Sequence, residues 1–83
     1  MAEAELGAAL DRLAEAWHYS RLAGDRARAV HALAEAAEFY DRAVDCGRRT
    51  AGAVSRSRSF VEVAEALGDV RYRLGDFARA ESA

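Results

Sequence analysis

The chain has 83 residues, enough for one small domain, and shows no sign of a second hydrophobic core. It contains no proline, and alanine supplies much of its 52% apolar content, so the composition predicts an all-α fold. All 12 basic residues are arginine and the formal net charge is −2, which argues against a general nucleic-acid binder.

The cellular compartment follows from cysteine usage and from the start of the chain. Cys46 is the single cysteine, so an internal disulfide is excluded. The first ten residues lack the charged start and the apolar run of a secretion signal. No segment approaches the roughly 20 apolar residues that span a bilayer. These features predict a cytoplasmic protein with no membrane partner.

Two long helices are predicted in the first half, over about residues 4–22 and 26–45. The first has apolar residues at alternating steps of four and three, which form one stripe: Leu6, Leu10, Leu13 and Trp17. The second has its own stripe: Val30, Leu33, Ala37, Tyr40 and Val44. Between them, Gly24 and Asp25 match a helix end followed by an N-cap, so a tight corner is predicted there.

A linker and a third helix are predicted in the second half. Residues 47–59 are small, polar and rich in arginine and serine, without helical periodicity. Ser59 and Glu62 match a capping box, so the third helix is predicted over about 60–74. Its apolar stripe is Phe60, Val63 or Ala64, Leu67, Val70 and Leu74. Gly75 and Asp76 repeat the earlier corner, and a fourth helix is predicted to start at 77.

An internal repeat carries a family resemblance. RLAGDRARA at 21–29 and RLGDFARA at 73–80 are near copies, as expected for repeated helix pairs. Residues 66–80 resemble a tetratricopeptide repeat, with these residues at its characteristic positions: Leu67, Gly68, Gly75, Phe77 and Ala80. The resemblance implies antiparallel helical hairpins in a three- to four-helix bundle that binds a peptide or a partner helix.

The resemblance also implies which residues face the partner, because the first helix of each pair lines a groove in that family. Carried over by position, the residues expected to face the groove are Ala14, His18, Arg21 and Leu22 on the first helix and Glu62, Glu65, Asp69, Tyr72 and Arg73 on the third. Among them, the predicted partner-binding residues are His18, Arg21, Asp69, Tyr72 and Arg73. Arginine recognises carboxylates with two parallel hydrogen bonds, and tyrosine offers a rigid amphipathic surface. The alternative is that these are ordinary surface residues.

Two clusters of histidine and glutamate offer a different interpretation of the chain. Glu15 and His18, with a second cluster at His31, Glu35 and Glu38, have helical spacings that suit metal ligands. Both clusters are predicted to face away from the core, where charged residues pair on a solvated surface. A metal-binding or enzymatic bundle assembled from several chains is therefore the alternative function.

The sequence thus predicts a non-enzymatic module for protein interaction or oligomerisation, with no cofactor and with a protein, a peptide or a second copy as partner. It leaves open the partner's identity, the oligomeric state and whether the chain is part of a longer repeat protein. The arginines between Arg48 and Arg58 either contact an acidic group or belong to a solvated linker.

Overall fold

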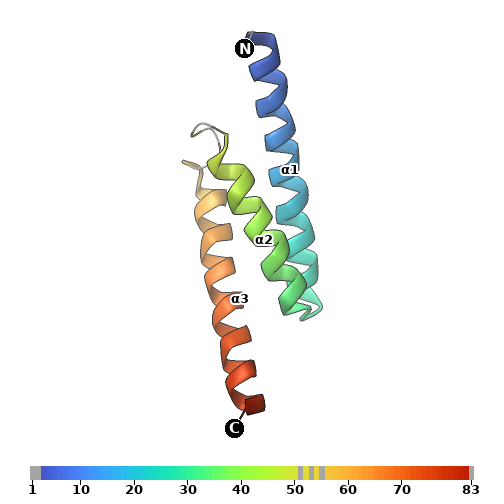
Figure 1. Ribbon diagram of the computed structural model, residues 1–83, viewed down its shortest axis with the longest axis vertical. Coiled ribbons are helices and arrows are strands. Elements are labelled where there is room, and N and C mark those ends of the chain that lie inside the picture. Colours follow the sequence, from blue (N-terminus) through green and yellow to red (C-terminus); the bar gives the residue numbers. More distant parts are fainter. Residues whose placement is uncertain (1–2, 51, 53, 55, 83) are drawn as a thin grey trace.

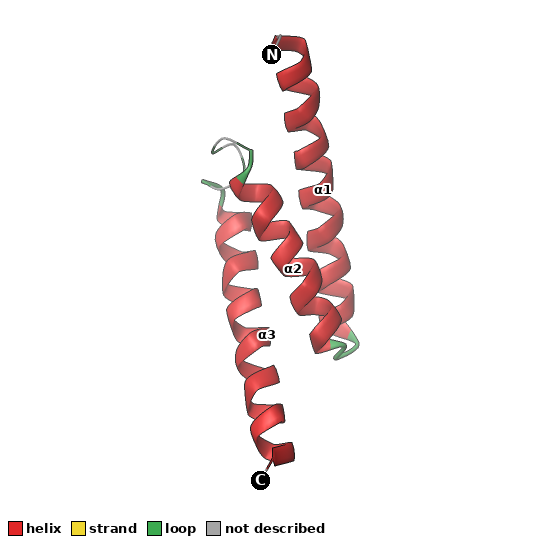
Figure 2. Cartoon of the chain, in the orientation of Figure 1, coloured by secondary structure: helices red, strands yellow, loops and turns green. Residues whose placement is uncertain are grey.

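Three helices make up most of the chain that the structure describes. The computed structural model describes residues 3–50, 52, 54 and 56–82, and no strand occurs among them. The helices are α1 (Glu3–Ala29), α2 (Leu33–Arg48) and α3 (Arg58–Ser82). The chain reverses direction between successive helices, so α1 and α3 run the same way and α2 runs against both (Figure 1). The predicted all-α class is confirmed (Figure 2).

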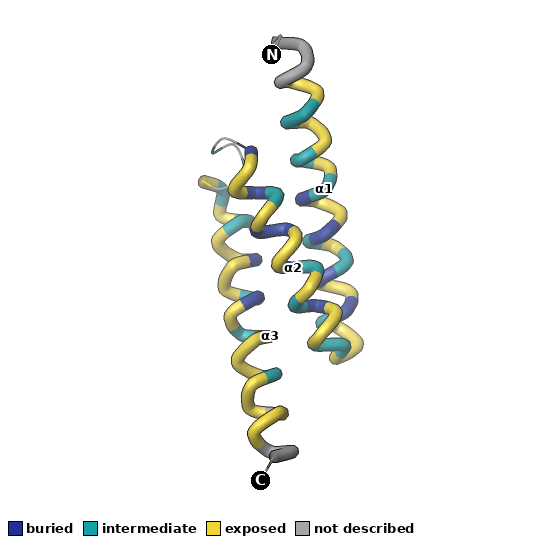
Figure 3. The backbone as a smooth tube through the Cα atoms, viewed as in Figure 1, coloured by how far each residue is buried: buried dark blue, intermediate teal, exposed yellow. Residues whose placement is uncertain are grey.

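The helices differ in length, and this gives the molecule an elongated shape of 56 × 21 × 19 Å. α1 and α3 have 27 and 25 residues, whereas α2 has 16. The start of α1 and the end of α3 therefore project beyond α2 at opposite ends of the molecule (Figure 1). Buried residues concentrate where α2 lies against the other two helices (Figure 3).

The first corner is not where the sequence predicted it. α1 continues without a break through Gly24 and Asp25 and ends at Ala29. The chain reverses at His31, which has a φ of 61°. The amide of His31 donates to the Arg28 carbonyl at 3.0 Å and that of Ala32 to the Ala27 carbonyl at 2.8 Å. This pair of hydrogen bonds around a left-handed residue closes a helix end, although glycine is the usual residue there.

Gly24 has a packing role instead of a turn role. A Cβ atom at this position would lie 2.6 Å from two ring carbons of Tyr40. Glycine therefore lets α1 approach the α2 ring closely. Asp25 is likewise not an N-cap, because it lies inside α1. Its carboxylate instead accepts a hydrogen bond from the Tyr40 hydroxyl at 2.6 Å.

The predictions of a second corner at Gly75 and Asp76 and of a fourth helix from residue 77 are also wrong. α3 runs through Gly75 and Asp76 to Ser82, so Phe77 lies inside α3 and does not start a new helix. A glycine inside a helix costs about 1 kcal/mol relative to alanine, which a run of good helix formers on both sides outweighs.

The predicted linker is shorter than expected. α2 ends at Arg48, close to the predicted stop at Gly47, and α3 begins at Arg58, two residues early. The cap is Ser57 and not Ser59, because the Phe60 amide donates to the Ser57 hydroxyl oxygen at 3.1 Å. Positions 51, 53 and 55 of the predicted linker lie outside the described residues.

The core lies along α2. The buried apolar residues are Trp17, Ala27, Ala36, Tyr40, Ala43, Val44, Val63, Leu67 and Val70. The predicted stripe of the third helix is confirmed, since its other two members, Phe60 and Leu74, pack against this cluster. Val30 was predicted to be in the core but is 74% exposed, because it lies in the turn after α1.

Candidate functional site

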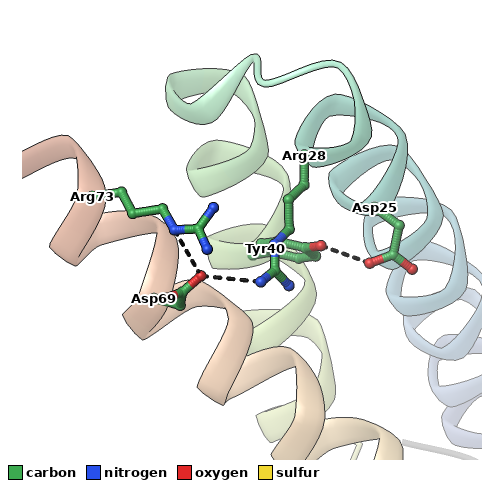
Figure 4. A network of polar contacts seen from close by, with 5 residues as sticks. All are labelled: Asp25, Arg28, Tyr40, Asp69 and Arg73. Carbon is green, nitrogen blue, oxygen red and sulfur yellow. Dashed lines mark hydrogen bonds and ion pairs between the residues drawn. The ribbon is translucent and has the colours of Figure 1, made fainter. Parts of the chain in front are cut away.

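A network of polar contacts joins the three helices (Figure 4). Arg28 of α1 reaches across to α3, where its guanidinium donates to the Asp69 carboxylate at 3.0 Å. Arg73, one turn further along α3, lies 3.2 Å from the same carboxylate oxygen. Asp69 therefore forms ion pairs with two arginines, and the pair with Arg28 links α1 to α3.

Tyr40 of α2 forms the inner part of the network. Its side chain is fully buried, and its hydroxyl donates to Asp25 of α1 (Figure 4). Burial raises the pKa of Tyr40 to about 12, and the hydrogen bond to Asp25 and the negative charge of that carboxylate add to the rise. The Arg28 side chain acts in the opposite direction on this pKa. The phenol is therefore held neutral and hydrogen-bonded.

An open cavity of about 260 Å³ lies between α1 and α3 beside this network. Its lining residues are Arg28, Glu62, Glu65, Ala66 and Asp69. The two glutamates are exposed, and neither has an ion-pair partner among the described residues. Three carboxylates thus face one arginine, which is already engaged with Asp69. The cavity carries an excess of negative charge.

The predicted partner-binding residues are only partly brought together. Asp69 and Arg73 are joined by an ion pair, and Asp69 lines the cavity. His18 is exposed and Arg21 half-buried on α1, and neither lines the cavity. Tyr72 is 66% exposed and does not line it either.

Arg28 lines the cavity and was not among the residues predicted to face the groove. It lies seven residues after Arg21 and therefore on the same face of a continuous helix, a spacing visible in the sequence. The predicted corner at Gly24 ended the helix before Arg28 and hid this relation.

The alternative metal cluster does not assemble within the part of one chain that the structure describes. No group of three or more histidine, cysteine, aspartate or glutamate residues there could hold a metal ion. His31 lies in the turn after α1 and not on the second helix, as had been predicted. Glu35 and Glu38 are exposed on α2, and Glu15 is exposed on α1.

The fold and the site define an all-α, three-helix chain with a charged cavity between its two parallel helices. Comparison of the chain with models of protein families, with curated proteins and with solved structures finds no match. The resemblance to tetratricopeptide repeats therefore stays a prediction from the sequence, and Gly68 and Gly75, which carried it, both lie inside α3. Across the described residues, none of the helices combines the length and the apolar character that crossing a bilayer requires.

Proposed function

We propose that the chain is a non-enzymatic protein-interaction module that holds a peptide or a partner helix between α1 and α3. The observation that carries this proposal is the open cavity, where Glu62 and Glu65 present carboxylates without a partner among the described residues. An exposed carboxylate pair of this kind suits a ligand that brings its own positive charge.

The geometry of the cavity favours a partner with arginine side chains. Glu62 and Glu65 are three residues apart on α3 and so lie on neighbouring turns of one face. A guanidinium group binds carboxylates through two parallel hydrogen bonds, which gives geometric selectivity as well as charge attraction. Arg28 lies on the opposite wall and is occupied by Asp69, so it leaves both glutamates available.

The test is a binding titration with a defined probe. An alanine-rich helical peptide with two arginines four residues apart is titrated against the full chain, beside a peptide with glutamates at the same positions. We expect the arginine peptide to bind and its affinity to fall as salt is raised, because exposed ion pairs are screened. The glutamate peptide should not bind.

Matched variants place the binding in the cavity. The double variant Glu62→Gln and Glu65→Gln should weaken the arginine peptide about fivefold, since each exposed pair contributes about 0.2–1 kcal/mol. Glu38→Gln removes an exposed carboxylate of α2 outside the cavity and should leave binding unchanged. Equal weakening by both changes, or equal binding of the two peptides, would contradict the proposed site.

A further inference from the structure

A second surface lies on the face of α3 that points away from the core. Positions 61, 65, 68, 72, 75 and 79 are alternately four and three residues apart and therefore lie along one side of the helix. The six residues are Val61, Glu65, Gly68, Tyr72, Gly75 and Arg79. We call this set the outer seam.

The outer seam exposes apolar side chains beside open space. Val61 is 51% exposed and Tyr72 66% exposed. A Cβ atom placed on Gly68 or on Gly75 would meet nothing within 4 Å. Nothing among the described residues therefore explains glycine at these positions, where alanine would favour the helix. The two gaps would admit a large side chain from another helix.

The outer seam is complementary to itself when it is reversed. Its positions are symmetric about residue 70, so an antiparallel copy sets Tyr72 opposite Gly68 and Arg79 opposite Val61. The Tyr72 ring then fills the space above the glycine of the other chain. Arg79 is paired with Asp76 of its own chain and comes beside Glu65 of the other chain, which has no ion-pair partner among the described residues of its own chain. A guanidinium group has five N–H donors and can therefore bond both carboxylates.

We propose that the outer seam of α3 binds a second copy of this chain in a two-fold symmetric, antiparallel helix pair. Each contact occurs twice in such a pair, as in other isologous dimers. Charge complementarity and the fit of tyrosine over glycine together select a second copy as the occupant. The outer seam adjoins the cavity at Glu65, which belongs to both, whereas Glu62 lines the cavity outside the seam and Gly68 and Tyr72 lie in the seam outside the cavity. This dimer therefore extends the function proposed above and does not depend on it.

The test compares two glycine substitutions in the full chain by analytical ultracentrifugation over a concentration series. Gly68→Gln fills the gap opposite Tyr72 and should abolish the dimer. Gly7→Gln is the matched control, since Gly7 is helical, exposed and has nothing within 4 Å of a Cβ atom. Both changes replace glycine by a better helix former, so neither variant should fail to fold. The control should dimerise like the unmodified chain.

Tyrosine and charge variants test the register. Tyr72→Ala should weaken the dimer about tenfold, as expected of a central aromatic anchor. Tyr19→Ala removes a side chain that is 69% exposed on α1 and should have no effect. Glu65→Arg should weaken the dimer about threefold, and the added change Arg79→Glu should restore it.

Two results would overturn the antiparallel pair. One is an unmodified chain that remains monomeric at about 1 mM, because a specific dimer of this kind should have a dissociation constant below that concentration. The other is a dimer that Gly68→Gln leaves intact, because the copies would then meet through another surface. Peptide binding to the cavity can be measured in Gly68→Gln and Tyr72→Ala, whose positions do not line it, so failure of one proposal is distinguishable from failure of the other.

Discussion

His31 is the residue whose backbone conformation is least suited to its side chain. Its φ of 61° lies in the left-handed region, where glycine is favoured because it has no Cβ atom. The chain accepts histidine there because the hydrogen bonds of Ala32 and His31 to the last turn of α1 hold the reversal. The backbone strain at His31 is therefore offset by the hydrogen bonds that close the end of α1.

His31→Gly should therefore stabilise the protein. We expect the free energy of unfolding in urea to rise by about 0.5–1 kcal/mol, because the strain of a left-handed side chain is removed. His18→Gly is the control, since His18 is exposed inside α1, and it should lower the free energy of unfolding by about 1 kcal/mol. A loss of stability at both positions would show that the histidine side chain is needed in the turn.

Tyr40 makes stability depend on alkaline pH. Its pKa is about 12 in the folded protein against 10.0 for the free side chain. Both states are protonated below pH 10, whereas between pH 10 and 12 the unfolded chain loses the phenol proton first. The stabilisation is therefore complete below pH 10, and we expect the free energy of unfolding to fall as pH rises through this window. The chain has no lysine to titrate over the same range.

The variant Tyr40→Phe isolates this effect. It should lose about 1 kcal/mol at neutral pH, since the hydrogen bond to Asp25 disappears, and it should show a flatter pH profile above pH 10. Tyr72→Phe, at an exposed position, should keep the steep fall of the unmodified chain. Urea unfolding at several pH values provides the measurement, and a steep fall in Tyr40→Phe would assign the effect to another group.

Among the helices, the two glycines at the predicted corners should respond oppositely to alanine. Gly24→Ala places a Cβ atom 2.6 Å from the Tyr40 ring, so we expect a net loss of about 1–2 kcal/mol from overpacking. Gly75→Ala meets nothing within 4 Å and should gain up to about 1 kcal/mol of helix stability. Thermal unfolding in dilute solution measures both. A loss at Gly75 would indicate a corner there after all.

The sequence predicted the apolar face of the third helix better than the ends of the helices, and the fourth helix that it predicted from residue 77 is the last part of α3. The stripe Val63, Leu67 and Val70 is buried as expected, because helical periodicity directly encodes which face packs. The glycine corners failed because glycine serves both turns and close helix contacts, and the two uses look alike in a sequence. The real turn at His31 carries no glycine and so gave no local signal.

The cavity was predicted in part. Glu62, Glu65 and Asp69 were expected to lie on one face of the third helix, and all three line the open cavity. Arg28 could not be placed correctly while the first helix was thought to end at 22. Tyr72 was expected to face the groove but lies exposed on the outer seam. Its position depends on how α3 is rotated against α2, and helical periodicity alone does not determine that rotation.

In the whole molecule, the contact between Trp17 and Phe60 ties the two parallel helices together. Their ring centroids are 5.9 Å apart, and Trp17 is only 2% exposed. Phe60 also covers Gly47 of α2, where a Cβ atom would lie 2.7 Å from its ring. One aromatic side chain thus contacts all three helices.

Phe60→Ala should largely unfold the protein. We expect a loss of about 2–4 kcal/mol, which is comparable to the whole stability of a domain of this size. Trp17 fluorescence should shift to the red as the indole meets water. Leu22→Ala removes a side chain that is 54% exposed on α1 and should change stability by less than about 0.5 kcal/mol. A blue-shifted Trp17 emission in Phe60→Ala would show that α1 and α2 shield the indole without α3.

The shortest helix also governs how the molecule opens. Because α2 lies against both longer helices, its amide protons can exchange with solvent only when its contacts with both are lost, whereas the projecting ends of α1 and α3 can fray alone (Figure 1). Hydrogen exchange followed by NMR should therefore be slowest along α2, near Ala36 to Val44, and fastest at those two ends. The amides of α2 would then exchange only through global unfolding, and their protection factors would measure the stability of the entire bundle.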